Sequence, residues 1–120
     1  MKYVVFFLFL PILTFATTQN EACKAMKNSR MEMDIVSSNI ANVSTTKTPE
    51  GGPYRRKELV CVNLNCYVKE VSEVIVKYEQ DHPDADDNGY VSYPAINLMQ
   101  EMEAMIQATR NYEVAAKDCK

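Results

Sequence analysis

Apolar residues recur at helical spacing near both ends of this chain. In the stretch ACKAMKNSRMEMDIVSSNIANV, apolar and small positions alternate at intervals of three and four residues. This is the period of an amphipathic helix with a narrow, coiled-coil-like seam. The pattern predicts a helix over residues 22–43. Its expected seam consists of Met26, Ser29, Met33, Val36, Ile40 and Val43.

The second periodic stretch lies at the other end and is the clearest in the chain. It predicts a helix over residues 96–118, with Asn97 as the N-cap, because an asparagine side chain can accept hydrogen bonds from the first free amides. Its narrow stripe suits a seam between two helices better than full burial. The expected seam consists of Leu98, Met102, Met105, Thr109, Tyr112, Ala116 and Cys119.

The segment between the helices reads as loops and strands. Residues 44–53, STTKTPEGGP, have loop composition. A strand is expected over residues 59–62 and a turn over residues 63–65. A second strand is expected over residues 66–78, which are rich in β-branched residues, although part of 69–78 also fits helical spacing.

An acidic turn, EQDHPDADDNG, follows at residues 79–89. Pro94 then favours an extended approach to the final helix. The chain therefore predicts an α+β fold. Its N- and C-terminal helices pack as an antiparallel, coiled-coil-like pair around a small β-hairpin region, with loop and β structure over residues 44–94.

The first residues have the layout of a secretory signal peptide. Lys2 precedes an apolar run, and small residues follow near Ala16. We expect a signal peptide over residues 1–16, a mature domain over 17–120, and export of the mature chain. A retained membrane anchor is the alternative, but the run is shorter than the ~20 residues of a spanning helix.

Four cysteines in an exported chain indicate disulfides. Three pairings are possible. Folding the two helices back on each other brings Cys23 near Cys119, and the turn at residues 63–65 brings Cys61 opposite Cys66. Spacing therefore favours the pairs Cys23–Cys119 and Cys61–Cys66.

The acidic turn contains a partial calcium motif. Asp84, Asp86, Asn88 and Gly89 match the start of an EF-hand loop, but Ala95 occupies the position that requires a bidentate glutamate. A solvated acidic turn explains these residues better. We therefore expect no metal site and no cofactor.

The remaining polar residues give no sign of catalysis. His82 is the only histidine, and no serine or cysteine lies in a nucleophile motif. Asn42 begins a glycosylation sequon, which is a short and unspecific match. The net charge of −3 gives no reason to expect nucleic-acid binding, and we expect neither an enzyme nor a small-molecule substrate.

Two charge clusters stand apart in the sequence. Arg55, Arg56 and Lys57 form a basic cluster, and residues 81–87 form an acidic one. Both can be solvated surfaces. They can also be complementary contacts between copies of the chain, and this is a hypothesis at this point.

Two stretches resemble a known protein family. Ser38 to Asn42, S-N-I-A-N, is similar to a motif of flagellar rod and hook proteins. The run TPEGGPYRRK from Thr48 resembles the flagellar basal-body rod protein FlgC family in particular, as do HPDAD from His82 and the segment around Tyr112. The matched motif residues are Pro49, Gly51, Gly52, Pro53, Tyr54, Arg55 and Arg56.

The resemblance implies a structural subunit of the flagellar basal-body rod that acts in motility, with other rod proteins or copies of itself as partners. Three departures are the apparent signal peptide, the cysteine set and a short C-terminal helix. The alternative is therefore a disulfide-stapled periplasmic adaptor on the same fold. The seams and the resemblance together assign subunit packing to Met26, Met33, Asn39, Ile40, Asn42, Leu98, Met102, Met105 and Tyr112.

Overall fold

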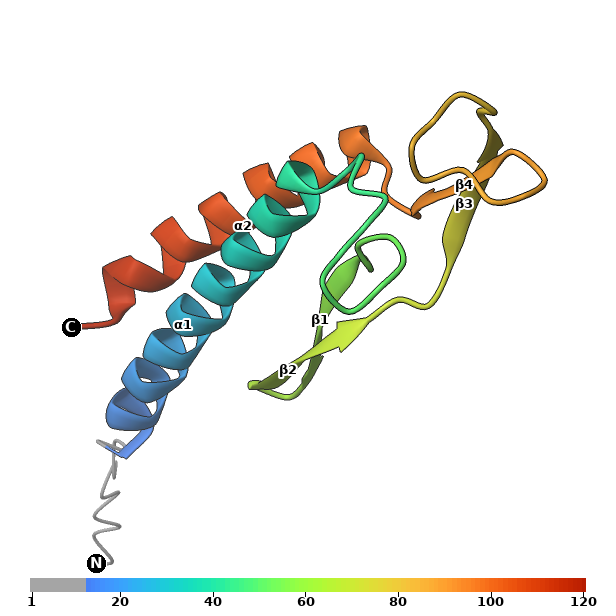
Figure 1. The fold of residues 1–120 in the computed structure, drawn as a ribbon. Coiled ribbons are helices and arrows are strands. Elements are labelled where there is room, and N and C mark those ends of the chain that lie inside the picture. The colour runs from blue at the N-terminus through green and yellow to red at the C-terminus, as the bar shows by residue number, and fades with distance from the viewer. Residues whose placement is uncertain (1–12) are drawn as a thin grey trace, which may run out of the picture.

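A computed structural model describes residues 13–120 of the chain. Most of the expected signal peptide, residues 1–12, lies outside the described residues. Two long helices enclose four short strands in the sequence (Figure 1). The elements are α1 (Leu13–Ala41), β1 (Lys57–Val62), β2 (Asn65–Glu70), β3 (Val74–Tyr78), β4 (Tyr90–Pro94) and α2 (Leu98–Asp118).

The two terminal helices pack against each other in antiparallel orientation, which confirms the α+β fold. Near the start of α1, Cys23 is bonded to Cys119 just after α2, and the Gln19 amide donates to the Lys120 carbonyl at 3.3 Å. The helix bounds differ from those expected: α1 begins at Leu13 rather than residue 22, and α2 begins at Leu98. Neither described helix is both long and apolar enough to cross a bilayer.

The face that α2 turns inward differs from the expected seam. Its buried residues are Glu101, Ala108 and Ala115, at intervals of seven. Leu98 and Met102, both assigned to the seam, are 40% and 48% exposed. Small side chains allow the helix backbones to approach closely, so alanines occupy the contact and the larger side chains lie outside it. The period was predicted correctly, and Met105 and Tyr112 of the expected seam are half-buried, but the phase was wrong for Leu98 and Met102 at the start of the helix.

The β region contains two hairpins, not one. β1 pairs with β2, and β3 pairs with β4, both antiparallel. The expected single strand over residues 66–78 is broken because β2 ends at Glu70, opposite Lys57, the first residue of β1. The Val71 amide still donates to the Arg56 carbonyl at 2.7 Å, and the chain then leaves this hairpin and pairs with β4. The helical alternative over residues 69–78 is also wrong.

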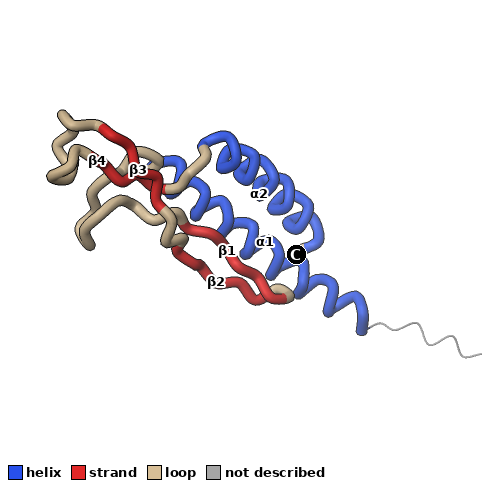
Figure 2. The backbone as a smooth tube through the Cα atoms, turned by 90° about the vertical axis from the view of Figure 1, so that its right-hand side faces the viewer, coloured by secondary structure: helices blue, strands red, loops and turns tan. Residues whose placement is uncertain are grey.

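The β1–β2 hairpin lies along α1 (Figure 2). Its two-residue turn contains Asn63 with φ 55°, a conformation that asparagine tolerates well. At this tip, the Asn28 side chain donates to the Leu64 carbonyl at 3.0 Å, and the Lys24 ammonium donates to the Asn65 side chain at 3.3 Å. The tip is therefore held to the N-terminal half of α1.

The β3–β4 hairpin lies beyond the paired ends of the helices (Figure 1). Val91 in β4 is only 1% exposed, and Pro94 and Ile96 are buried where the chain enters α2. Together with Ile35 and Val36 of α1, these residues form most of a thin core. A core of this size stabilises a chain weakly, so covalent links matter.

We expect the two disulfides to stabilise the fold unequally. Cys23–Cys119 spans 96 residues and Cys61–Cys66 spans 5. In the chain-entropy model, replacing the long-range pair by alanines lowers the free energy of unfolding by about 4–5 kcal/mol, and replacing the short-range pair lowers it by about 2 kcal/mol. Urea unfolding followed by circular dichroism measures both values. Equal losses in the two double variants would contradict this expectation.

Candidate functional site

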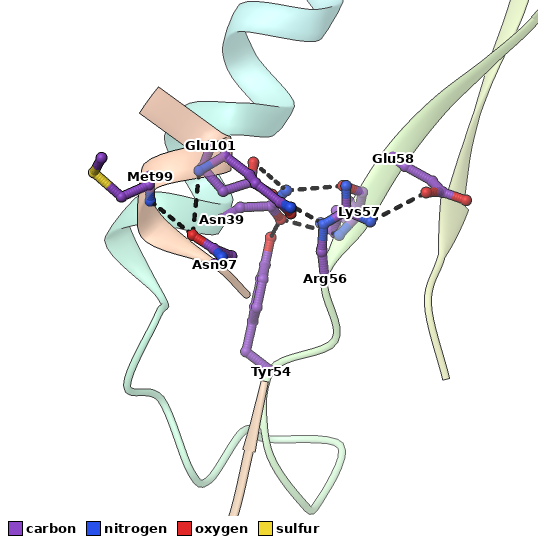
Figure 3. A network of polar contacts seen from close by, with 9 residues as sticks. Asn39, Tyr54, Arg56, Lys57, Glu58, Asn97, Met99 and Glu101 are labelled. Atoms are coloured by element: carbon purple, nitrogen blue, oxygen red, sulfur yellow. Dashed lines mark hydrogen bonds and ion pairs between the residues drawn. The ribbon is translucent and has the colours of Figure 1, made fainter. Parts of the chain in front are cut away.

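A buried polar junction joins α1, the start of β1 and the first turn of α2 (Figure 3). Its centre is formed by Asn39 and Glu101, which are 1% and 3% exposed. Tyr54 and Arg56 reach it from the segment that leads into β1. No buried side-chain nitrogen or oxygen atom within the described residues lacks a hydrogen-bond partner. The junction is therefore a fully satisfied polar core.

Asn39 uses its whole hydrogen-bonding capacity there. Its Nδ2 donates to the Lys57 carbonyl at 2.8 Å and to Glu101 Oε2 at 3.2 Å. Its Oδ1 accepts from the Lys57 amide at 3.0 Å and from the Tyr54 hydroxyl at 2.8 Å. An asparagine side chain has two donors and two acceptor sites, and all are occupied. Asn39 thus fixes β1 at one register against α1.

Glu101 is a buried carboxylate with partners on both oxygens. Oε1 accepts from Arg56 Nε at 2.9 Å, while Oε2 accepts from Asn39. The Arg56 guanidinium also pairs with Glu58 at 3.1 Å. A carboxylate this deeply buried requires a nearby positive charge, because the interior solvates it poorly. Arg56 supplies that charge.

The position of Glu101 is set by the start of α2. Asn97 is the N-cap, as predicted: its Oδ1 accepts from the amides of Met99 at 3.0 Å and Gln100 at 3.3 Å. Glu101 follows in the first turn, where the helix macrodipole also favours a negative charge. The cap therefore holds the carboxylate at the junction.

Glu32 of α1 lies beside this ion pair. Burial raises the pKa of Glu32 above its usual 4.5, and the negative charges of Glu101 and Glu58 raise it further, while the positive charge of Arg56 lowers it. Three carboxylates thus share one arginine. The folded state therefore disfavours the negative charge of Glu32 relative to the unfolded chain.

Two family sequence models match the terminal segments of the chain. The model of the flagella basal body rod protein family matches residues 20–47. The model of the C-terminal part of the flagellar basal body rod FlgEFG proteins matches residues 87–117. Together these matches cover most of α1 and all but the end of α2.

Curated relatives extend the similarity across the β region. The flagellar basal-body rod protein FlgC of Borreliella burgdorferi is 35% identical over 123 residues, covering 78% of this chain and 81% of that protein. The chain belongs to the FlgC family of flagellar basal-body rod proteins. FlgC of Agrobacterium fabrum is 39% identical over 92 residues, covering 66% of each chain. FlgC of Salmonella typhimurium is 28% identical over 104 residues, covering 77% of this chain and 78% of that protein.

Membership of the FlgC family identifies the chain as a structural rod subunit without enzymatic activity. No group of three or more potential ligands within residues 13–120 is placed to hold a metal ion. His82 Nδ1 accepts a hydrogen bond from the Asp84 amide, and the Asp86 carboxylate accepts from the amides of Asn88 and Tyr90. These contacts shape the acidic turn itself.

The FlgC-like motifs have a structural explanation. Asn39 and Asn42 come from the S-N-I-A-N motif, and Tyr54 and Arg56 from the P-Y-R-R-K motif. Three of these residues build the junction. Asn42 lies just beyond α1, where its side chain donates to the Ser38 carbonyl at 2.8 Å and accepts from the Thr45 hydroxyl at 3.1 Å. These side chains make their contacts within the chain, and the assignment of Asn39 and Asn42 to subunit packing stays a prediction.

The rest of the motif forms the loop that positions Tyr54 at the junction. Beyond Pro49, the chain turns through Gly51 and Gly52, whose φ angles are 89° and 73°. The Thr48 amide donates to the Gly52 carbonyl and closes this turn at 2.9 Å. Pro53 is buried directly afterwards. The glycines are needed here because other residues rarely adopt positive φ.

The residues of the basic cluster also make most of their contacts within the chain. Arg56 is bound to Glu101 and Glu58. Arg55 donates to the Ser72 carbonyl, and the Lys57 ammonium lies 5.9 Å from the centre of the Tyr54 ring. Arg56, the central charge of this cluster, is therefore already paired within the chain, which weakens the hypothesis that the cluster contacts the acidic turn of another copy.

The predicted packing residues separate into two groups. Met26, Met33 and Ile40 of α1 are half-buried, as are Met105 and Tyr112 of α2. Leu98 and Met102 are exposed, in a row with Met99 and Ile106, which are 71% and 55% exposed. We call Leu98, Met99, Met102 and Ile106 the outer row of α2. Only this second group leaves large apolar side chains free for a partner.

Sequence reasoning missed the roles of Glu101 and Glu32. The sequence did contain one signal for Glu101. It precedes Ala108 and Ala115 at intervals of seven residues, and small side chains such as these alanines mark a close contact between helices. Nothing local identified Arg56 as its partner, since the two are 45 residues apart.

Removing the arginine of the buried pair is expected to destabilise the protein strongly. Arg56→Met leaves the Glu101 carboxylate without its counter-charge, and breaking a buried pair in this way typically costs about 3–5 kcal/mol. Arg55→Met is the matched control, because Arg55 has only an exposed hydrogen bond, and it should cost less than about 1 kcal/mol. Denaturant titrations give both values. Similar losses in the two variants would show that the pair is unimportant.

Neutralising Glu32 is expected to stabilise the protein at neutral pH. Because its pKa is raised on folding, the folded state binds a proton more readily, and the resulting penalty is present at pH 7 and relieved as the pH falls. Glu32→Gln should therefore melt higher than the parent at pH 7, and the difference should close as the pH approaches 4.5. Asp34→Asn, an exposed change on the same helix, is the control. A lower melting temperature for Glu32→Gln at pH 7 would refute the assignment.

Proposed function

We propose that this chain is exported through the general secretory route, is oxidised in the periplasm, and assembles there with other rod proteins or with copies of itself. Membership of the FlgC family supports the assembly role. The apparent signal peptide over residues 1–16 supports the route, and two disulfides are typical of an oxidising compartment.

The observation that carries the assembly proposal is the orientation of α2. Its inner line consists of Glu101, Ala108 and Ala115, whereas the outer row of α2 bears large apolar side chains that the fold does not use. Aligned apolar side chains on a surface mark a contact with another molecule. Methionines suit such a contact because they adapt to the partner's shape.

The disulfides favour one alternative, a stapled periplasmic adaptor that uses the same outer row for a soluble partner. Both functions require the row, so variants there cannot distinguish them. Location can, because only a rod subunit becomes a stoichiometric part of the basal body.

The test follows a tagged chain in its flagellated host. The parent chain should co-purify with basal bodies. The double variant Met102→Glu with Ile106→Glu should not join them, but should remain soluble and keep both disulfides. Glu103→Gln with Gln107→Glu is the matched control, since it changes exposed polar residues of the same helix, and it should assemble normally. Non-reducing mass spectrometry of the parent reports the cleavage site and the cysteine pairs. A folded, oxidised parent chain absent from basal bodies would favour the adaptor.

A further inference from the structure

The β3–β4 hairpin presents an uncovered apolar face near its tip. Val76, Tyr78 and Tyr90 lie on one side of the hairpin and are 56%, 61% and 46% exposed. Tyr78 and Tyr90 are directly opposed in the ladder, and their rings stack edge-on with centres 5.3 Å apart. We call these three residues the aromatic face.

The opposite side of the same hairpin is covered only in part, because Ile75 is 44% exposed there. Val91 is buried there, and the Tyr93 hydroxyl donates to Glu79 at 2.7 Å while its ring lies 4.9 Å from the Lys77 ammonium. The aromatic face has no such cover from the described residues. A two-stranded hairpin is marginal in water unless a hydrophobic face packs on something. A second molecule can supply that cover.

Charge identifies the kind of partner. The loop that joins Tyr78 to Tyr90 contains five acidic residues and no lysine or arginine. Two of these carboxylates, Asp81 and Asp87, are exposed and make no hydrogen bond among the described residues. A surface that covers the aromatic face must therefore approach a concentrated negative charge. Basic side chains mixed with an apolar one fit this requirement.

The chain itself carries such a surface on α1. Lys24, Lys27 and Arg30 are exposed at intervals of three, beside Met31, which is 36% exposed. We call these four residues the basic face; Asp34 lies one turn further along the helix. The only ion pairs within residues 13–120 are those of Arg56. The charges of the basic face and of the acidic loop are therefore not neutralised by salt bridges within the described chain.

The two surfaces lie apart along the molecule (Figure 1). The aromatic face lies beyond the C-terminal end of α1, whereas the basic face lies at the middle of that helix. They cannot meet within one copy. Two different surfaces that meet between copies form a heterologous contact, which repeats from copy to copy and produces either a closed ring or an open, filament-like stack.

We propose that the aromatic face and acidic loop of one copy dock on the basic face of a second copy. This inference rests on the proposed assembly function and names one contact within it. Apolar cover of the hairpin supplies the attraction, and charge complementarity selects the helix face and the head-to-tail orientation.

A cross-link tests the contact directly. The full oxidised chain is prepared with a photoreactive phenylalanine analogue at position 76, whose side chain is exposed, and is irradiated at a concentration at which it self-associates. Peptide mapping is expected to find the cross-link within residues 24–31 of another copy. Cross-links concentrated on any other surface, or none in an associated sample, would overturn the proposal.

Charge reversal provides the second arm. Lys27→Glu with Arg30→Glu should weaken self-association in sedimentation experiments by more than about tenfold, because like charges then face each other. Asp81→Lys with Asp87→Lys should weaken it similarly, and combining the two pairs should restore it. Glu50→Lys with Glu70→Lys, two exposed changes elsewhere, is the control. Circular dichroism and non-reducing mass spectrometry verify that each variant is folded. Failure of the combined variant to recover would contradict the pairing.

The two proposals can fail separately. A chain that co-purifies with basal bodies but does not cross-link to residues 24–31 keeps its function and loses this contact. A chain that is absent from basal bodies but cross-links there keeps the contact and loses the proposed function.

Discussion

The buried carboxylate of Glu101 constrains this fold more than any other single group. Arg56 balances its negative charge in the interior, and its second oxygen accepts a hydrogen bond from the side-chain amide of Asn39. These partners come from three separate segments: α1, the approach to β1 and the first turn of α2. All three must be in place before any one is satisfied. With a core of few apolar side chains, such a junction defines the arrangement of the elements more sharply than hydrophobic burial alone.

The sequence predicted the features that depend on local spacing. Helical period located both helices, and Asn97 was recognised as a cap because capping needs only the next few residues. The cysteine pairs followed from antiparallel helices and a short turn, and the structure contains those pairs. The motif residues around Tyr54 identified the family, which the relatives confirm.

Features that depend on distant partners were not predictable in the same way. The run from Cys66 to Tyr78 reads as one strand, and only the end of β1 at Lys57 shows why it divides. The phase of α2 was misjudged because large apolar side chains were assumed to face inward. Instead, Ala108 and Ala115 face α1, and Leu98 and Met102 face outward. For a chain that assembles, hydrophobicity indicates burial in the assembly as well as burial within the subunit.

The Cys23–Cys119 bond has a topological consequence. It closes almost the entire described chain into a covalent ring, because the two cysteines are 96 residues apart. A ring of this kind can traverse a narrow pore only as two parallel strands, whereas a reduced chain passes as one. Any conduit that admits a single extended polypeptide therefore requires this bond to form on the far side. Once the bond has formed, the chain can no longer pass back through such a conduit as a single strand.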